Sequence, residues 1–318
     1  MAKDVLDFLK AQDGFVSGEE ISRALKISRT AVWKHIERLR AEGYLIEAVP
    51  HLGYRIISIP DKLLPEEISY QLNTKVIGQR LFYYETLGST MDAAFELGLK
   101  GFPEGTAVFA ESQTKGRGRL GRSWFSPKGK GIYLSLLLRP EFLPQEAPKI
   151  TLMTAVSISE AIKKITGLSV LIKWPNDIVF GAKKLAGILT ELNAEADKIK
   201  FVNIGIGINV NSSKSFLPKE GTSLKEEIGT EVSRIELARE VLRAIENNYF
   251  ILKDKGFKPI LEKWKALSAI LGKRIEISSQ NRVICGEAQD IDMDGALLVR
   301  QDTGFIERVL SGDVIKIL

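Results

Sequence analysis

The chain has 318 residues, of which 44% are hydrophobic and 27% are charged, and its mean hydropathy is -0.01. These values are typical of an ordinary globular protein. Because the length exceeds what one small core fills, we expect two or three domains. The formal net charge of +5 is too small for a histone-like binder, so any nucleic-acid surface must be local.

Cysteine and histidine are too scarce to build a disulfide framework or a Cys-based zinc site. The chain has one cysteine, Cys285, and two histidines, His35 and His51, so we expect no protein-built metal centre. The N-terminus places Asp4 and Asp7 where a signal peptide needs an apolar core, and no apolar run is long enough to span a bilayer. The sequence therefore predicts a cytoplasmic protein without a membrane partner.

The first sixty residues have the pattern of a winged helix-turn-helix. A first helix is predicted over residues 2–12, and serines at N-cap positions, Ser17 and Ser28, begin a second and a third. The third helix runs to Gly43, and two strand-like segments within residues 44–57 flank a turn and form a hairpin. The shift to proline and polar residues that follows places the first domain boundary after residue 62.

A basic segment that includes most of the third helix has a net charge of +5, which equals that of the whole chain. Residues 23–40 hold six basic residues and one acidic residue, and a basic helix of this kind is suited to the major groove of DNA. The alternative is a solvated helix face, but three helices and a wing form a specific combination. The predicted DNA-contacting residues are Ser28, Arg29, Thr30, Trp33, Lys34 and Arg38.

From residue 80 onward, strand-like runs alternate with two helical patterns, 89–99 and 149–165. This alternation predicts a mixed α/β domain with one sheet covered by helices. The strand-like runs are 80–85, 106–110, 132–138, 170–173, 186–192 and 201–209. A long helical pattern over 233–266 is expected to serve packing, with Leu261 and Trp264 in a turn after it.

The most informative stretch is a glycine-rich loop, 113–124, with the sequence QTKGRGRLGRSW. Its glycines match the pattern G-x-G-x-x-G, yet a Rossmann loop opens into a helix and this loop leads into a strand. The spacing of a P-loop is absent as well. A mobile loop with four cations favours an anion such as a phosphate; the alternatives are a solubilising loop or a DNA contact. The cations are Lys115, Arg117, Arg119 and Arg122.

Three further motifs follow in the central domain. In the sequence KWPND, a turn would direct Asn176 and Asp177 away from a sheet edge. In KKLAGIL, Lys184 enters an apolar strand, which suggests an ammonium facing a carboxylate or phosphate. The alternatives for these two motifs are an Asx turn and a lysine that reaches solvent. In 203–210, NIGIGINV, alternating glycines would let a flat ligand or a helix lie close to the strand.

Together these motifs, in this order, resemble the biotin protein ligases, specifically the bifunctional type that also represses the biotin operon. The resemblance covers essentially the whole chain. It implies that ATP converts biotin to biotinyl-5′-AMP and that biotin then passes to a lysine of a carboxylase's biotin carrier domain. Mg²⁺ is expected wherever ATP is adenylated.

The resemblance also implies roles for individual residues. The predicted catalytic residues are Lys184, Arg119 and Asp177, which would neutralise or orient the reacting groups. Residues predicted to bind biotin are Ser89, Thr90, Met91, Gln113, Arg117, Gly118, Arg119 and Lys184. Residues predicted to bind ATP or the adenylate are Arg119, Arg122, Trp124, Asn176, Asp177 and Asn209. Two positions depart from the family pattern: Met91 stands where asparagine is frequent, and Leu120 where a polar residue is frequent.

From residue 272 onward, short alternating strands predict a small SH3-like β-barrel, in which Cys285 would pack as a small hydrophobe. The predicted fold is thus α+β and multidomain: a winged helix-turn-helix over 1–62, a helix-covered mixed α/β ligase domain over 63–268 and a barrel over 269–318. The resemblance further implies a homodimer favoured by biotinyl-AMP that binds operator DNA. The rival functions are a sensor-repressor without catalysis and a lipoate or octanoate ligase.

Overall fold

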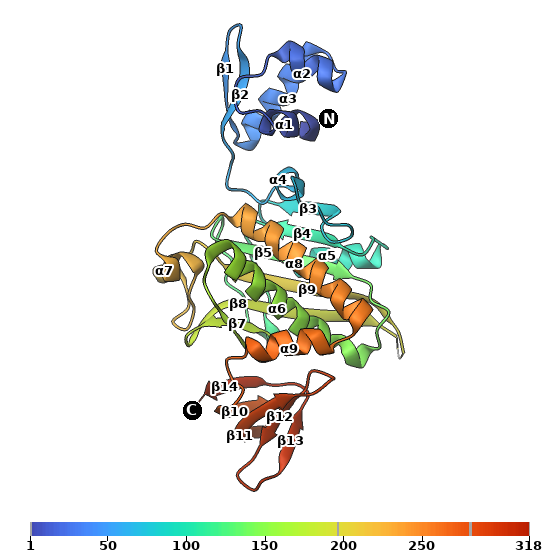
Figure 1. Ribbon diagram of the computed structural model, residues 1–318, viewed down its shortest axis with the longest axis vertical. Helices are drawn as coiled ribbons and strands as arrows, with labels where there is room; N and C mark the ends of the chain where they lie inside the picture. The colour runs from blue at the N-terminus through green and yellow to red at the C-terminus, as the bar shows by residue number, and fades with distance from the viewer. Residues whose placement is uncertain (1, 196, 280–281, 318) are drawn as a thin grey trace. The chain divides into compact units, whose positions relative to one another are not determined.

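The computed structural model describes residues 2–195, 197–279 and 282–317, which fold into two compact units, residues 1–62 and 63–318. The first unit contains three helices and a two-stranded antiparallel sheet (Figure 1). Its elements are α1 (Ala2–Lys10), α2 (Gly18–Leu25), α3 (Arg29–Glu42), β1 (Leu45–Val49) and β2 (Gly53–Ser58).

Both predicted helix starts in this unit are confirmed. Ser17 Oγ accepts a hydrogen bond from the Glu20 backbone N–H, and Ser28 Oγ accepts one from the Ala31 backbone N–H, each at 3.1 Å. These caps satisfy backbone donors that the first helical turn leaves open. The C-cap of α3 is Gly43, with a φ of 105°, a conformation that glycine adopts without strain.

The second unit contains a seven-stranded mixed sheet, here called the central sheet, with the strand order β3-β4-β5-β9-β8-β7-β6. β3 and β4 are parallel and the other neighbours are antiparallel. The strands are β3 (Arg80–Tyr84), β4 (Thr106–Ala110), β5 (Gly131–Leu138), β6 (Leu171–Lys173), β7 (Asp177–Phe180), β8 (Lys183–Ala194) and β9 (Ile199–Asn209).

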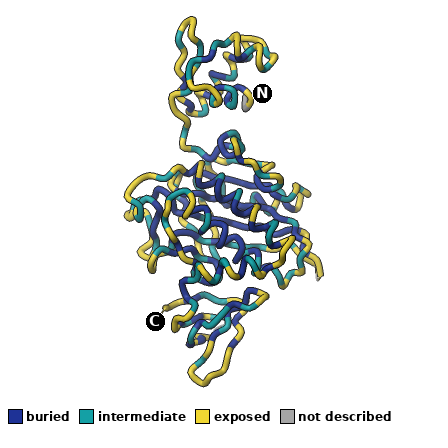
Figure 2. The backbone as a smooth tube through the Cα atoms, viewed as in Figure 1, coloured by how far each residue is buried: buried dark blue, intermediate teal, exposed yellow. Residues whose placement is uncertain are grey.

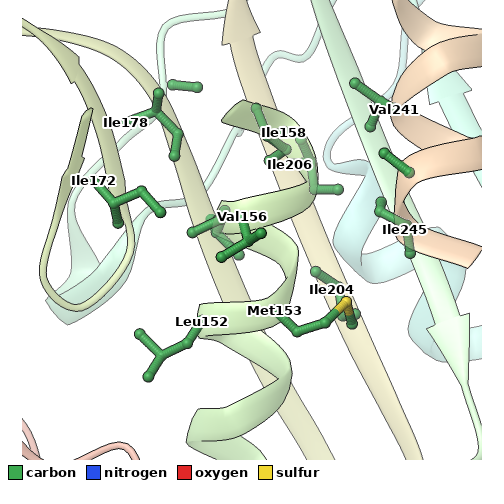
Figure 3. Close-up of a cluster of buried hydrophobic side chains, with 14 of the residues drawn as sticks. Leu152, Met153, Val156, Ile158, Ile172, Ile178, Ile204, Ile206, Val241 and Ile245 are labelled. Atoms are coloured by element: carbon green, nitrogen blue, oxygen red, sulfur yellow. The ribbon is translucent and has the colours of Figure 1, made fainter. Parts of the chain in front are cut away.

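Two long helices, α6 (Ala147–Thr166) and α8 (Arg234–Lys255), lie side by side over one face of the central sheet (Figure 1). Met153 and Val156 of α6 pack against Ile204 and Ile206 of β9 (Figure 3). The sheet and the inner sides of these helices form the buried interior (Figure 2). The other helices are α4 (Pro65–Ser69), α5 (Thr90–Leu99), α7 (Leu224–Ile228) and α9 (Lys258–Ala266), with 3-10 turns η1 (Arg119–Gly121), η2 (Pro144–Glu146) and η3 (Lys214–Phe216).

Two local expectations are corrected. Asp177 begins a strand, β7, because the turn after Trp174 reverses the chain into an antiparallel hairpin with β6. The helical pattern over 233–266 forms two helices, because Gly256 ends α8, and Leu261 and Trp264 lie in the second, α9. Pro65 opens the short helix α4 just after the boundary between the two units.

The chain ends in a five-stranded antiparallel sheet, here called the C-terminal sheet, whose last strand pairs with its first. This order is the one expected for an SH3-like barrel. Its strands are β10 (Arg274–Ser279), β11 (Arg282–Ile291), β12 (Leu297–Arg300), β13 (Ile306–Val309) and β14 (Asp313–Ile317). Cys285 lies on β11 as a strand residue but is exposed, so its expected packing in the core is wrong. Among the described residues, no helix has the length and hydropathy needed to cross a bilayer.

Candidate active site

The floor of the candidate site is the strand β9, where isoleucine and glycine alternate. Because successive residues of a strand point to opposite faces, Ile204 and Ile206 face the helices α6 and α8, while Gly205 and Gly207 face the opposite side. The glycines leave a shallow surface without side chains in the middle of a buried sheet. The predicted close approach of another group to this strand is confirmed.

Two side chains from other segments rest on this floor. A Cβ atom at Gly205 would lie 2.5 Å from Met91 Sδ, and one at Gly207 would lie 2.4 Å from Trp124 Cε2. Both distances are far shorter than van der Waals contact, so glycine is required for Met91 and Trp124 to sit where they do. The Trp124 Nε1–H is buried and has no hydrogen-bond partner among the described residues.

One side of the site is a wall of polar groups at the start of α5. Ser89 caps this helix and accepts a hydrogen bond from the Met91 N–H at 3.2 Å. Gln113 Oε1 accepts hydrogen bonds from the Thr90 N–H at 2.8 Å and from the Thr90 hydroxyl at 3.1 Å. The structure thus joins the adjacent residues Ser89 and Thr90 to Gln113, which follows Thr90 by 23 residues, into one surface.

The opposite side of the site carries positive charge. Lys184 Nζ lies 2.6 Å from Asp177 Oδ1 and 5.6 Å from the centre of the Trp124 ring. The expectation that this lysine faces a carboxylate is therefore confirmed. β7 and β8 are neighbouring antiparallel strands, and their pairing brings the two residues together.

The glycine-rich loop contributes two arginines to the same region. Arg119 Nη1 donates hydrogen bonds to Asn176 Oδ1 at 3.1 Å, to the Gly312 carbonyl at 3.2 Å and to Asp313 Oδ1 at 2.8 Å. Arg122 Nη2 lies 2.8 Å from Asp313 Oδ2. Asp313, at the start of β14, thus holds both arginines against the edge of the site.

The loop's first arginine, Arg117, pairs with other carboxylates than Asp313. Its guanidinium lies 2.8 Å from Glu191 Oε1 on β8 and 2.9 Å from Asp92 Oδ1 on α5.

Leu120, at the tip of the loop, has a φ of 55°, a left-handed conformation that is strained for a leucine. Its side chain is exposed.

These groups line two adjoining cavities. The first, of about 110 Å³, lies over the glycine floor, and among its lining residues are Ser89, Thr90, Met91, Gln113, Arg117, Gly118, Arg119 and Lys184. The second, of about 460 Å³, lies toward the C-terminal sheet, and among its lining residues are Arg122, Trp124, Lys173, Asn176, Asp177, Asn209 and Asp313. Lys184 and Asp177 line both cavities.

This arrangement suits a reaction between two anions. Lys184 and Arg122 line both cavities and Arg119 lines the first, so cations stand where they would offset the repulsion between a carboxylate and a phosphate.

Nearby, burial raises the pKa of the Tyr133 phenol well above its ordinary value. Its hydroxyl therefore stays protonated and donates a hydrogen bond to the Pro127 carbonyl at 3.0 Å, which fixes the end of the loop.

Every residue that the sequence analysis assigned to biotin or adenylate lines one of the two cavities. Sequence reasoning missed Asp313, although the pair Gly312-Asp313 interrupts the apolar alternation of the last strands. It also missed Ser126 and Ser135, two buried serines beside the polar wall. The sequence offered a sign for Ser135, since it interrupts the apolar run GIYLSLLL.

The predicted DNA-contacting residues form a second surface, on the first unit. Arg29, Thr30 and Trp33 of α3 line a hollow together with His51 and other residues of the hairpin turn. Trp33 is 53% exposed, which is unusual for so large an apolar side chain. The remaining predicted residues, Ser28, Lys34 and Arg38, are exposed as well.

Three family models match the chain. Residues 83–211 match the biotin/lipoate A/B protein ligase family, residues 2–55 match a helix-turn-helix domain and residues 270–316 match the biotin protein ligase C-terminal domain. The biotin protein ligase from Aquifex aeolicus in complex with biotin and ATP is a structural neighbour with a TM-score of 0.64 and 33% identity, covering 74% of this chain and 97% of that chain. The fold and the site therefore define a biotin protein ligase.

Two curated relatives narrow this class. The bifunctional ligase/repressor BirA of Bacillus subtilis is 42% identical over 319 residues, which span 99% of this chain and 98% of the relative. The bifunctional ligase/repressor BirA of Escherichia coli is 32% identical over 96% of this chain and 94% of the relative. This chain belongs to the family of bifunctional biotin ligase/repressors.

Proposed function

We propose that this chain activates biotin with ATP, transfers it to a lysine of a biotin carrier domain and binds operator DNA as a transcriptional repressor. The observation that carries the catalytic part is that Lys184 and Arg122 line both the first cavity and the larger second one, while Arg119 lines the first. Biotin would occupy the first cavity and the nucleotide the second. The order of domains, 1–62 for DNA, 63–268 for catalysis and 269–318 for the C-terminal sheet, is part of this proposal.

In the first half-reaction, a carboxylate oxygen of biotin attacks the α-phosphorus of ATP, and the bond from that phosphorus to the pyrophosphate oxygen breaks. Lys184 and Arg119 would hold both anions and neutralise the charge that develops between them. In the second, an uncharged lysine amine attacks the acyl carbon and AMP leaves. Asp177, which lies 2.6 Å from Lys184, would orient the amine.

Mg²⁺ fits this site only together with the nucleotide. The described residues contain no group of three or more His, Cys, Asp or Glu side chains suited to hold a metal. Mg²⁺ is usually held by one or two carboxylates plus substrate phosphates. Both oxygens of Asp313 are paired with arginines, whereas Asp177, which lines the second cavity, pairs with Lys184 through Oδ1 alone. Asp177 would help to hold the ion, which would shield the charge of the phosphates.

The test is to incubate the purified full chain with ATP, Mg²⁺ and biotin and to detect biotinyl-AMP by mass spectrometry. We expect adenylate from the wild type and a loss of at least about a hundredfold in Lys184→Ala and Arg119→Ala. Lys164→Ala, which removes a lysine paired with Glu240 on the other face of the sheet, is the matched control. Adenylate formed from lipoate or octanoate but not from biotin would contradict the proposal.

Ligand-linked dimerisation is supported by the edge of β8. This strand pairs with β7 only over Lys183–Gly187, and no described strand covers that side from Leu189 to Ala194. An uncovered strand edge is a template for a second copy. Arg117 of the loop contacts Glu191 within this edge, so a ligand that orders the loop would also order the edge.

The dimer and DNA proposals share one test. Operator affinity and sedimentation of the full chain are measured with and without biotin plus ATP. We expect the adenylate to raise both the dimer fraction and the affinity for operator DNA. Equal operator affinity with and without the ligands would contradict the coupling and leave the ligase activity standing.

A further inference from the structure

A buried serine lies behind the polar wall of the site. Ser135 is fully buried on β5, where its neighbours in sequence are leucines. Placing a hydroxyl in such surroundings costs free energy unless it forms a hydrogen bond. Ser135 Oγ donates one to Thr90 Oγ1 at 2.8 Å, and it faces the site because its cross-strand partner is Gly205 of the floor.

This hydrogen bond is the first of a series of connected hydrogen bonds. A backbone N–H determines which group is the donor and which is the acceptor in each of them. The Thr90 N–H can only donate, so the group of Gln113 that faces it must be the amide oxygen. The Thr90 hydroxyl donates to the same oxygen. Because the only hydrogen of the Thr90 hydroxyl is donated to Gln113, Thr90 Oγ1 acts as the acceptor in its hydrogen bond with Ser135. Ser135 Oγ is the donor of that bond.

A second serine fixes the other end of Gln113. Gln113 Nε2 donates to Ser126 Oγ at 2.9 Å, and Ser126 Oγ donates to the Trp124 carbonyl at 3.2 Å. Ser126 is also buried, with 5% of its surface exposed. The chain of bonds, here called the serine relay (Ser135, Thr90, Gln113 and Ser126), thus runs from the middle of the sheet to the base of the glycine-rich loop.

The relay leaves one hydrogen-bond donor and one hydrogen-bond acceptor free to face the first cavity. Gln113 keeps one amide hydrogen that it has not donated within the relay, and Thr90 Oγ1 keeps a lone pair. A ureido group carries a carbonyl acceptor beside N–H donors, so it complements a wall that offers one donor next to one acceptor. A wall free to reorient would offer this pattern only part of the time, because hydroxyl and amide groups would populate other rotamers.

We propose that Ser135 and Ser126 are positioning residues for the acid substrate: they hold Thr90 and Gln113 in the one hydrogen-bonding pattern that receives the ureido ring of biotin. This inference rests on the proposed function and assigns two residues that would not themselves touch the substrate. On this inference, the selectivity for a cyclic urea depends on Ser135 and Ser126, which lie behind the residues that face the substrate.

The test compares three serine-to-alanine variants of the full chain. Ser135→Ala and Ser126→Ala each remove one relay bond, and Ser159→Ala is the control because it deletes an equally buried hydroxyl that bonds to the Ala155 carbonyl within α6. We expect the two relay variants to raise the Kd and KM for biotin about tenfold and to leave the KM for ATP unchanged. A general structural loss would move both substrates together and would lower the melting temperature in proportion.

A double-mutant cycle separates positioning from packing. Thr90→Val removes the group through which Ser135 acts, so Ser135→Ala should weaken biotin binding about tenfold in the wild type and not at all in the Thr90→Val background. Isothermal titration calorimetry with biotin alone measures the effect of Ser135→Ala on the Kd for biotin in both backgrounds, and it requires no turnover. Equal effects of Ser135→Ala in the two backgrounds would overturn the inference.

Failure of the inference is distinguishable from failure of the function. If the wild type binds biotin and both relay variants bind it as tightly as Ser159→Ala does, the relay has no positioning role and the proposed function stands. If the folded wild type does not bind biotin, the proposed function is wrong and the inference falls with it.

Discussion

Asp313 Oδ1 lies 2.8 Å from Arg119 Nη1, although 194 residues separate them along the chain. The same carboxylate reaches Arg122 through its other oxygen, also at 2.8 Å. One residue of the C-terminal sheet therefore determines where two arginines of the glycine-rich loop stand. The C-terminal sheet is in this sense a wall of the site.

Substituting Asp313→Asn should raise the KM for ATP about tenfold, since the loss of a charge-assisted hydrogen bond lets both arginines leave their places. The KM for biotin should change less. Steady-state kinetics of adenylate formation measure both values. The matched control is Asp302→Asn, which removes a carboxylate paired with Arg274 in the same sheet at an exposed position. A lower KM for ATP in Asp313→Asn would show instead that the carboxylate competes with the phosphates.

The glycine floor predicts a rank order of effects. Gly207→Ala should abolish most adenylate formation, because the new Cβ would lie 2.4 Å from the rigid indole of Trp124. Gly205→Ala should be milder, since the atom it meets is Sδ of a flexible methionine. Rates of adenylate formation test this order, with Gly14→Ala as a control where a Cβ meets nothing within 4 Å. Equal rates in the two floor variants would contradict it.

The fully buried Arg234 guanidinium donates to Glu111 Oε2 at 2.7 Å, and Glu111 Oε1 accepts the Leu63 N–H at 2.8 Å. Glu111→Gln should lower the free energy of unfolding by about 3 kcal/mol, because it leaves a charge in the interior without its counter-charge. Urea denaturation measures the loss. Asp302→Asn, which breaks an exposed pair, should cost less than about 1 kcal/mol. A similar cost for both variants would show that the buried pair contributes no more than a surface one.

On the first unit, Trp33→Ala and Arg29→Ala should weaken operator binding about tenfold or more, since both side chains line the hollow beside the wing. Adenylate formation should be unchanged because neither residue belongs to the catalytic unit. Fluorescence anisotropy with operator DNA measures the first quantity and mass spectrometry the second. Unaltered operator affinity in both variants would mean that DNA contacts lie elsewhere.

Features that depend on near neighbours in the sequence were predictable. The caps at Ser17 and Ser28 follow from residues three positions apart, and the glycine floor follows from the alternation in β9. The partnership of Lys184 with a carboxylate was predictable as a chemical need.

Features that depend on distant residues were not predictable in the same way. Asp313 reaches the arginines only because β14 pairs with β10 beside the loop. The position of Ser135 in the serine relay follows from strand register, which sets this residue opposite Gly205. No local pattern encodes such distances.

The side chain of Met91 lies over Gly205, so the depth of the first cavity at that point is set by a residue of α5 and not by the strand beneath it. Pocket size can therefore be altered at a single position without disturbing the sheet. A smaller residue at position 91 opens a hollow above the glycine, and biotin analogues enlarged on the matching side would fill it. Position 91 is thus the place at which the size of the accepted acid could be changed by one substitution.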